Sequence, residues 1–359
     1  VLPRPQGAVQ LPARGRALVP TRRLPVQRPP RVQAAALISP VHVPRSLLLV
    51  LFILVDTGQA LAMDFAEKRK WMKERQGRQY ARQTALVVES TLSICTGLGA
   101  AAFMGGTAGL RGCFNLQLML RFLPVACCFG IGLSLKFMAV NHFQAGTIKI
   151  LGQLRLPLIA LLSVPLLARA YTSVQWLVIS MVSTSCLAFV ILKGQGRSSA
   201  GKEWKLNGLV QLLGWVLLNV VGGVLAEKTY KSGNAPYYVQ KVAQDFGHLL
   251  VSTVMLLYVV PRFKPSENIR DQAQRPGGFF DSWDWRTVSV VGFLFLDAWI
   301  GNLLLKEFSG VTRSVSKAVS VSVVYFSSLW YSKERRSNPA LTLLALLVIQ
   351  SSLLFGIVS

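Results

Sequence analysis

Positively charged side chains stand inside apolar stretches of this chain, where the neighbouring residues would suit a lipid bilayer. One such stretch, GTIKILGQLRLPLIALL, carries Lys149, Gln153 and Arg155. At about 100° per residue, Arg155 shares a helix face with Gly152, which would leave room beside it. Lys149 and Gln153 share the adjacent face. Because a guanidinium can hold a phosphate through two hydrogen bonds, these residues are candidate ligands for an anionic substrate.

A second group of polar side chains lies closer to the C-terminus. Asn302 and Lys306 are four residues apart, so they lie on one helix face. Arg313 and Lys317 have the same spacing and open the next apolar segment. If the two halves of the chain are related by a pseudo-two-fold axis, these cations and Arg155 would line one electropositive pocket.

Each of these cations has a second interpretation. Long cationic side chains near the end of a membrane helix can extend to the lipid headgroups, which would account for Lys149 and Arg155. Lys306 and Arg313 would equally suit anchors at the membrane boundary. Arg155 lies well inside its apolar segment, so we favour a functional role for it.

The elements that would position these residues are long apolar segments. A bilayer core about 30 Å thick needs about 20 residues for one helical crossing. The chain has ten such segments, which predicts an all-α membrane protein with ten transmembrane helices. The expected segments are residues 46–63, 83–104, 116–140, 145–168, 172–193, 206–226, 238–260, 286–307, 311–331 and 339–358.

Turn-forming residues mark the expected ends of these segments, among them Gly105-Gly106 after the second one. The sixth segment ends at Glu227 and Lys228, which fit an ion pair of small energetic weight at a helix end. Small residues should allow helices to approach closely. They are Gly97, Gly99, Ala100, Gly130, Gly132, Gly222 and Gly223.

The ten segments divide into two sets of five, within residues 46–193 and 206–358. In both halves a very short turn joins the third and fourth segments, at residues 141–144 and about 308–310. Repeats with an odd number of crossings insert with opposite topology. We therefore expect an inverted 5+5 repeat over a transporter domain of residues 46–359, with a substrate site near the middle of the membrane.

The composition supports a membrane protein and argues against other classes. The 359 residues are 52% hydrophobic and 15% charged, with a formal net charge of +24; soluble domains average about 25% charged residues. We interpret the basic residues as flanks of membrane helices that meet anionic headgroups, and we expect no binding of nucleic acid. The sequence has no zinc, redox or hydrolase motif, so we expect a transporter without metal or cofactor rather than an enzyme.

Residues 1–45 differ from the rest of the chain. They are rich in Pro and Arg and contain no acidic residue. Such a segment cannot bury a hydrophobic core, so we expect it to be disordered. An acid-free, Arg-rich start fits an organellar transit peptide and equally a basic cytosolic tail, and both interpretations stay open.

Three stretches resemble the nucleotide-sugar transporters, in the branch that carries CMP-sialic acid, UDP-galactose and UDP-N-acetylglucosamine. Residues 143–179 are similar to the fourth and fifth helices of that family. They contain Gln-Leu-Arg-Leu at 153–156, where the family has Gln-Leu-Lys-Ile, and Val-Gln-Trp at 174–176, where it has Leu-Gln-Trp. Residues 222–231 resemble its Gly-Val-Tyr-Phe-Glu-Lys stretch, and residues 55–68 resemble its first helix.

The resemblance implies the drug/metabolite transporter fold, with ten helices in an inverted repeat. It implies that a pyrimidine nucleotide sugar is exchanged for a nucleoside monophosphate across the Golgi membrane. It places Arg155 where the family has a phosphate-contacting lysine, and Arg313 at a second basic position near the nucleotide. Asn302 replaces a small hydroxyl residue, and Lys241 stands where the seventh helix carries an asparagine.

The sequence departs from the family where a nucleotide base would be recognised. Ile148 and Gly152 stand in place of the stacking aromatic residues, and Asp245 stands in place of a tyrosine. Two alternatives therefore stay open: a plastid-type carrier of organic phosphates or other organic anions, and a polytopic membrane enzyme or scaffold. The expected partners are a nucleotide sugar, a nucleoside monophosphate and the lipid bilayer, with a homodimer as an open alternative.

Overall fold

The computed structural model describes residues 44–66, 82–139, 148, 152–195, 206–263, 269–274, 277–281, 283–331 and 339–358. The regular elements among these residues are all helices, which confirms the predicted all-α class. Of the predicted disordered tail, residues 1–43 lie outside the described part, as do Lys149 and the turn predicted at residues 141–144.

The helices overlap the segments that hydropathy predicts, and several of them, such as α3 and α8, extend beyond the predicted ends. Those that follow the predicted segments are α1 Arg45–Ala66, α3 Arg82–Cys113, α4 Leu116–Ala139, α6 Arg155–Leu167, α7 Ser173–Gln195, α8 Leu206–Ser232, α9 Tyr237–Val254, α12 Trp285–Glu307, α13 Gly310–Tyr331 and α14 Pro339–Val358. A π-helical turn, Met255–Val259, and α10, Val260–Phe263, extend α9. Two short helices, α11 Ile269–Ala273 and the 3-10 turn Gly278–Phe280, precede α12.

Length and hydropathy identify membrane-spanning helices among the described residues. Six helices meet both criteria: α1, α3, α4, α8, α9 with its extension, and α12. Two apolar helices, α6 and α14, are shorter in the stretches searched. The chain is therefore a multi-pass membrane protein, while the full count of ten crossings and the inverted repeat stay predictions.

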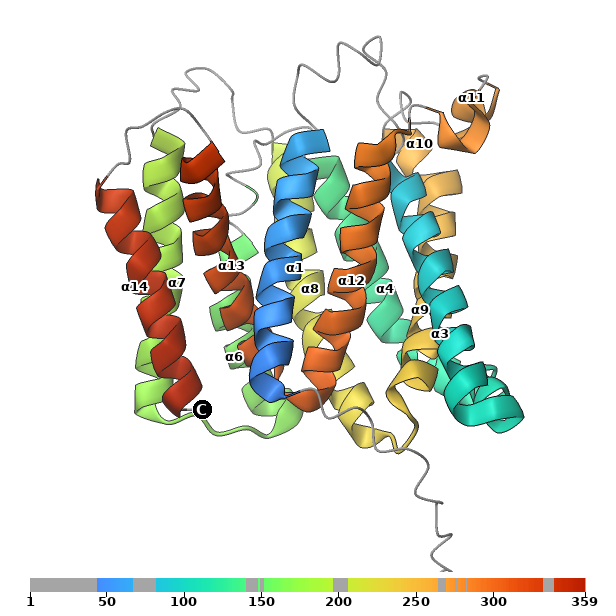
Figure 1. Ribbon diagram of the computed structural model, residues 1–359, viewed down its shortest axis with the longest axis horizontal. Helices are drawn as coiled ribbons and strands as arrows, with labels where there is room; N and C mark the ends of the chain where they lie inside the picture. Colours follow the sequence, from blue (N-terminus) through green and yellow to red (C-terminus); the bar gives the residue numbers. More distant parts are fainter. Residues whose placement is uncertain are drawn as a thin grey trace, which may run out of the picture. The chain divides into compact units, whose positions relative to one another are not determined.

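The helices stand side by side in one bundle, and the short connections gather at one end of it (Figure 1). In Figure 1, α7 and α14 pack together on one side and α3 and α9 on the other, with α1, α8, α12 and α4 between them. The connections at the lower end in Figure 1 are residues 114–115, 168–172, 233–236 and 308–309. The last of these confirms the short turn predicted between α12 and α13.

The predicted break at Gly105-Gly106 is a kink instead of a helix end. The chain adopts a left-handed conformation at Gly106 (φ 56°), which glycine tolerates because it has no Cβ atom, and the helix then continues to Cys113. After Cys113, the side-chain oxygen of Asn115 accepts hydrogen bonds from the backbone N–H groups of Gln117 (3.0 Å) and Leu118 (3.3 Å). This side chain caps the start of α4.

Two buried clusters hold the bundle together. Leu156, Ile159 and Val220 belong to a cluster shared by α6, α7, α8, α13 and α14. Phe122 and Tyr230 belong to a second cluster, which joins α4, α8, α9 and α12. Because α8 contributes to both clusters, it fixes the position of α6 and α13 relative to α4 and α9.

Several of the predicted small residues do lie at close helix contacts. A Cβ atom added at Gly97 would overlap with Val242 of α9, and one added at Gly222 would lie 2.9 Å from Cβ of Cys128 in α4. Gly99 differs, since no atom of the described residues lies within 4 Å of an added Cβ there. The prediction of close approach is therefore right for Gly97 and Gly222 and wrong for Gly99.

We expect Gly97→Leu to destabilise the contact between α3 and α9. Adding atoms to a packed contact typically costs about 1–3 kcal/mol, so the thermal unfolding midpoint of the detergent-solubilised protein should fall. Gly99→Leu is the matched control on the same helix, because the space beside it is open. Equal losses in the two variants would contradict the described packing.

Candidate anion-binding site

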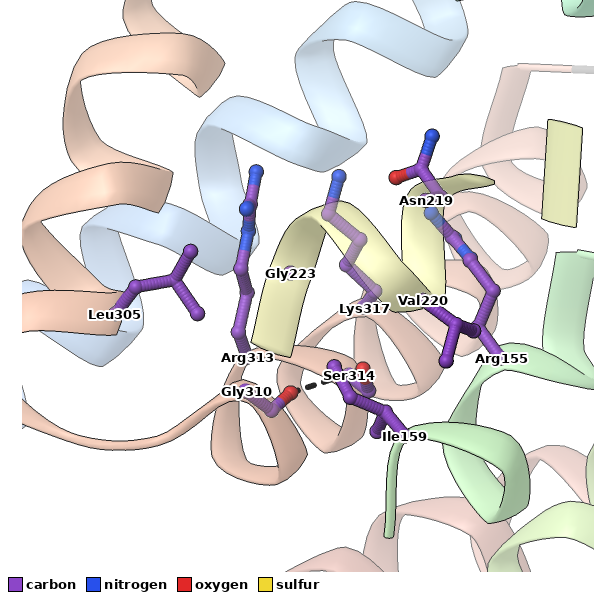
Figure 2. Close-up of a pocket in the computed structure, with 10 residues that line it drawn as sticks. All are labelled: Arg155, Ile159, Asn219, Val220, Gly223, Leu305, Gly310, Arg313, Ser314 and Lys317. Carbon is purple, nitrogen blue, oxygen red and sulfur yellow. Dashed lines mark hydrogen bonds between the residues drawn. The ribbon is translucent and has the colours of Figure 1, made fainter. Parts of the chain in front are cut away.

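A cavity opens between four helices of the bundle, and cationic side chains occupy its wall (Figure 2). Its volume is about 350 Å³, counting the part open to solvent. The lining residues are Arg155 and Ile159 of α6, Asn219, Val220 and Gly223 of α8, Leu305 of α12, and Gly310, Arg313, Ser314 and Lys317 of α13.

The first residue of α6, Arg155, is held from two sides. Its Nε atom donates a hydrogen bond to the carbonyl oxygen of Gly152 at 2.9 Å. Its guanidinium carbon lies 5.2 Å from the ring centroid of Trp215, a distance typical of a cation–π contact. The space that Gly152 leaves is taken by this ring, since an added Cβ atom would lie 3.0 Å from Trp215. Gln153 is buried beside this turn.

Arg313 of α13 reaches the cavity across a glycine of α12. A Cβ atom at Gly301 would lie 2.7 Å from the Arg313 Nη2 atom, so a larger residue there would displace this guanidinium. The guanidinium carbon lies 5.9 Å from the ring centroid of Phe52 and 6.0 Å from that of Phe129. The Arg313 Nε atom is buried and, among the described residues, has no hydrogen-bond partner.

The third cation of the cavity, Lys317, is paired with two carboxylates. Its ammonium nitrogen lies 3.1 Å from Asp56 of α1 and 3.3 Å from Asp297 of α12. Within the described part of the chain, neither Arg155 nor Arg313 lies within ion-pair distance of a carboxylate. The cavity therefore presents two guanidinium groups without a direct carboxylate partner among the described residues, beside one ammonium that is already paired.

The structure does not bring Lys306 to this cavity. Its ammonium donates hydrogen bonds to the carbonyl oxygen of Ala235 (3.2 Å) and to the side chain of Gln240 (3.0 Å), both near the start of α9. Asn302 turns the same way and donates to the side chain of Gln244 at 3.3 Å. The two residues thus share a helix face, as predicted, but that face contacts α9.

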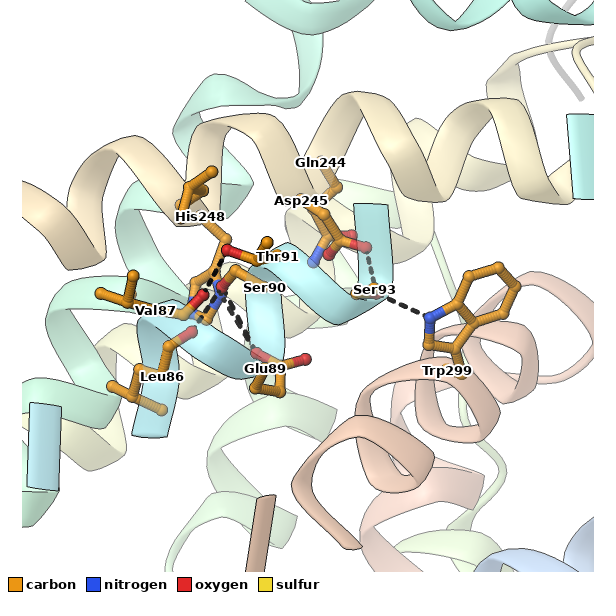
Figure 3. Close-up of polar contacts among 12 residues, drawn as sticks. Leu86, Val87, Glu89, Ser90, Thr91, Ser93, Gln244, Asp245, His248 and Trp299 are labelled. Carbon is orange, nitrogen blue, oxygen red and sulfur yellow. Dashed lines mark hydrogen bonds and ion pairs between the residues drawn. The ribbon is translucent and has the colours of Figure 1, made fainter. Parts of the chain in front are cut away.

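Lys241 lies in a separate polar cluster between α3 and α9. Figure 3 shows Ser93, Asp245 and Trp299 of this cluster. It is buried, forms an ion pair with Asp245, and donates a hydrogen bond to Ser93 at 3.1 Å. Ser93 also accepts a hydrogen bond from the indole nitrogen of Trp299 at 2.6 Å. The charge of Lys241 is therefore compensated inside the protein in this structure.

The same α3–α9 contact holds a second group of buried polar side chains. Ser90 lies 2.8 Å from Nδ1 of His248, and this nitrogen lies 3.7 Å from the Glu89 carboxylate (Figure 3). Sequence reasoning overlooked Glu89. An acidic residue within an apolar run was the available signal.

A buried carboxylate binds the backbone of Gly310, which lines the cavity. Glu227 of α8 accepts hydrogen bonds from the backbone N–H of Gly310 and from Lys231, each at 2.8 Å, and forms an ion pair with Arg169. Lys231 also donates to the carbonyl oxygen of Phe308. The predicted helix-end pair of Glu227 with Lys228 is thus replaced by a buried cluster that joins α8 to the start of α13.

Several residues at this site were not predicted from the sequence. Asp56 and Asp297 stand alone in apolar runs, which marks them as functional candidates in a membrane helix. Trp215 and Asn219 carried no signal, because a tryptophan or an asparagine in a membrane helix is common at packing positions. Lys136 also approaches Trp215, with its ammonium 5.4 Å from the ring centroid.

The fold and the cavity together define a multi-pass membrane protein whose helix bundle encloses a site with the chemistry to bind an anion. The sequence model of the family described as "Nucleotide-sugar transporter" matches residues 47–356. The chain therefore belongs to the nucleotide-sugar transporter family, and it is a transporter rather than an enzyme.

Comparisons with individual proteins add information on the fold. A search among curated proteins found no match. A solved protein titled "Crystal structure of protein" is similar to this chain, with a TM-score of 0.57 and 14% sequence identity. The match covers 85% of this chain and 94% of the other one, so it supports the same fold over most of both proteins.

We expect Lys241→Met to destabilise the protein strongly, because it would leave Asp245 as an uncompensated buried charge. Breaking one partner of a buried ion pair typically costs about 3–5 kcal/mol, whereas replacing both partners by apolar residues is often neutral. The double variant Lys241→Met with Asp245→Leu should therefore recover much of the thermal unfolding midpoint. A Lys241→Met variant as stable as the wild type would show that the pair does not form.

Proposed function

We propose that this protein exchanges a nucleotide sugar for the matching nucleoside monophosphate across the Golgi membrane, by alternating access to the cavity between α6, α8, α12 and α13. The observation that carries the proposal is the pair of guanidinium groups, Arg155 and Arg313, that line one cavity without a carboxylate partner among the described residues. The family supplies the class of substrate. The exchange and the Golgi location are our inference.

The cavity chemistry suits a ligand that carries phosphate. The phosphate oxygens would accept hydrogen bonds from Arg155 and Arg313, whose planar N–H groups match such an acceptor. Inside a membrane protein the attraction between these charges is stronger than in water, because the local dielectric constant is lower. Asn219 and Ser314 would supply neutral hydrogen bonds to the sugar or the base.

Other residues predicted from the sequence would act at a distance from the phosphate. Asn302 and Lys306 hold α12 against α9, and Lys241 is paired with Asp245. We assign them to the support of the bundle. Gln153 and Lys149 belong to the segment that leads into Arg155, and they would position that turn beside the ligand.

The buried cluster around Glu227 supports a closed lower side in this conformation. Glu227 joins α8 to the backbone of Gly310, which itself lines the cavity. Opening on that side would require the contacts of Glu227 with Arg169 and Lys231 to separate. We therefore assign Glu227 as a residue of the gate at the end of the bundle where the short turns lie.

A second candidate function is transport of a small organic phosphate, in a plastid or another organelle. It is favoured by the lining of the cavity, where none of the described residues is aromatic. A nucleotide base would thus have no ring to stack against inside the cavity itself. Uptake by proteoliposomes, measured with a panel of nucleotide sugars and of sugar phosphates after preloading with nucleoside monophosphate or phosphate, decides between the two.

We expect Arg155→Ala and Arg313→Ala each to lower uptake at least tenfold. Hydrogen bonds to charged groups contribute about 1.5–3 kcal/mol each, so loss of either guanidinium should exceed one factor of ten in affinity. Arg155→Lys should retain part of the activity, because the charge remains without the planar pair of donors. Arg262→Ala, an exposed arginine at the end of α10, is the matched control; full uptake by Arg155→Ala would remove Arg155 from the site.

The location of the protein distinguishes the two candidate functions independently of uptake. A fluorescent tag placed after residue 359 would leave residues 1–45 free to act as a targeting segment. We expect the tagged protein to coincide with a Golgi marker. Coincidence with a plastid marker would instead support the carrier of organic phosphates and would identify residues 1–45 as a transit peptide.

A further inference from the structure

Lys317 is held between two carboxylates that come from different helices. Asp56 belongs to α1 and Asp297 to α12, and both side chains are largely buried, with 16% and 13% of their surface exposed. Asp56 also accepts a hydrogen bond from Ser320 of α13. The carboxylates are therefore fixed beside the cavity. Their ion pairs hold the Lys317 ammonium, which would otherwise be available to contact a ligand.

The hydrogen bonding of this ion cluster is incomplete among the described residues. One oxygen of Asp297, Oδ1, is buried without a hydrogen-bond partner among the described residues, and so is Nε of Arg313. Buried polar atoms without partners are rare because each costs free energy. Lys136 of α4 lies against the same Trp215 ring as Arg155, so four cations and two carboxylates leave two net positive charges at this site. Among the described residues, no carboxylate lies within ion-pair distance of the guanidinium groups of Arg155 and Arg313.

We propose that Asp56 and Asp297 determine the charge of the anion that the cavity accepts, by holding Lys317 away from the ligand and repelling any further negative charge. This inference rests on the proposed function of the site. Two free guanidinium groups match a dianion. A third negative charge would have to displace the carboxylates from Lys317 or lie close to them, and juxtaposed like charges cost several kcal/mol in general.

The two ligands of the proposed exchange each carry two negative charges, which is the limit that the proposal sets for the cavity. A nucleoside monophosphate carries a charge of about −2 near neutral pH. A nucleotide sugar with two bridging phosphates is also a dianion, because each phosphate has one ionised oxygen. A nucleoside diphosphate carries one more negative charge and offers the same base and ribose. Asp56 and Asp297 would therefore make the site select the monophosphate over the diphosphate. Recognition of the base alone cannot do this, because both nucleotides carry the same base.

The test compares how well the two nucleotides compete with uptake. Proteoliposomes are preloaded with nucleoside monophosphate, and uptake of the nucleotide sugar is measured against external monophosphate or diphosphate of the same base. The wild type should be inhibited more strongly by the monophosphate. Asp56→Asn and Asp297→Asn, which remove charge and keep shape, should each shift the ratio of the two inhibition constants at least fivefold toward the diphosphate.

Glu307→Gln is the matched control, because this exposed residue at the end of α12 changes the net charge equally without facing the cavity. In this variant the ratio of the inhibition constants for monophosphate and diphosphate should equal that of the wild type. Asp56→Glu and Asp297→Glu keep the charge and should also keep the wild-type preference. An unchanged ratio in both asparagine variants would overturn the proposal.

A second measurement separates this inference from the proposed function. If the wild type takes up no nucleotide sugar, the proposed function fails, and the charge limit is then decided on the purified protein. We expect phosphate to raise the thermal unfolding midpoint of the wild type more than pyrophosphate does at equal concentration. This order should reverse in Asp56→Asn and Asp297→Asn. If phosphate stabilises the wild type and both variants more than pyrophosphate does, the carboxylates do not set a charge limit. This conclusion holds even if the variants no longer transport.

Discussion

A charged group inside a lipid bilayer must be compensated, and this requirement organises the structure. An ionised side chain away from water costs several kcal/mol unless a partner of opposite charge or a set of hydrogen bonds replaces the solvent. Lys241 meets the requirement through Asp245, and Lys317 through Asp56 and Asp297. Arg155 and Arg313 have no such carboxylate within ion-pair distance among the described residues, so that part of the chain leaves the compensation of their charge open. An anionic ligand in the cavity would supply it.

The same requirement ties distant parts of the chain together. The contacts of Lys317 join α13 to α1 and α12, and the hydrogen bond from Trp299 to Ser93 joins α12 to α3. α12 therefore takes part in the ion cluster of the cavity and in the polar contact with α3. A shift of α12 along its axis would change both sets of contacts, and each set limits how α12 can move. In this way the polar contacts that stabilise the bundle also fix the geometry of the site.

The sequence predicted the positions of the helices well and the contacts between them only in part. Hydropathy locates a membrane helix because each crossing requires a continuous run of apolar residues, whichever helices pack beside it. The prediction that Arg155 and Arg313 share one pocket rested on the assumed pseudo-two-fold relation between the two halves, and both arginines do line the cavity. The direction of Lys306 toward α9 depends on how α12 is rotated against neighbours far away in sequence, and no local pattern encodes that rotation. For the same reason the pairing of Lys317 with Asp56 emerged only from the packed structure.

Compensation by the ligand also bears on why transport would proceed as exchange. An empty cavity that reorients must carry the uncompensated guanidinium groups of Arg155 and Arg313 through a conformation closed to water on both sides, where their charge is least screened. A bound dianion neutralises the two groups in that closed conformation and so lowers its free energy. The occupied protein should therefore cross the membrane barrier faster than the empty one. Return after delivery of the nucleotide sugar then requires another dianion, and a nucleoside monophosphate meets that condition with the same phosphate contacts.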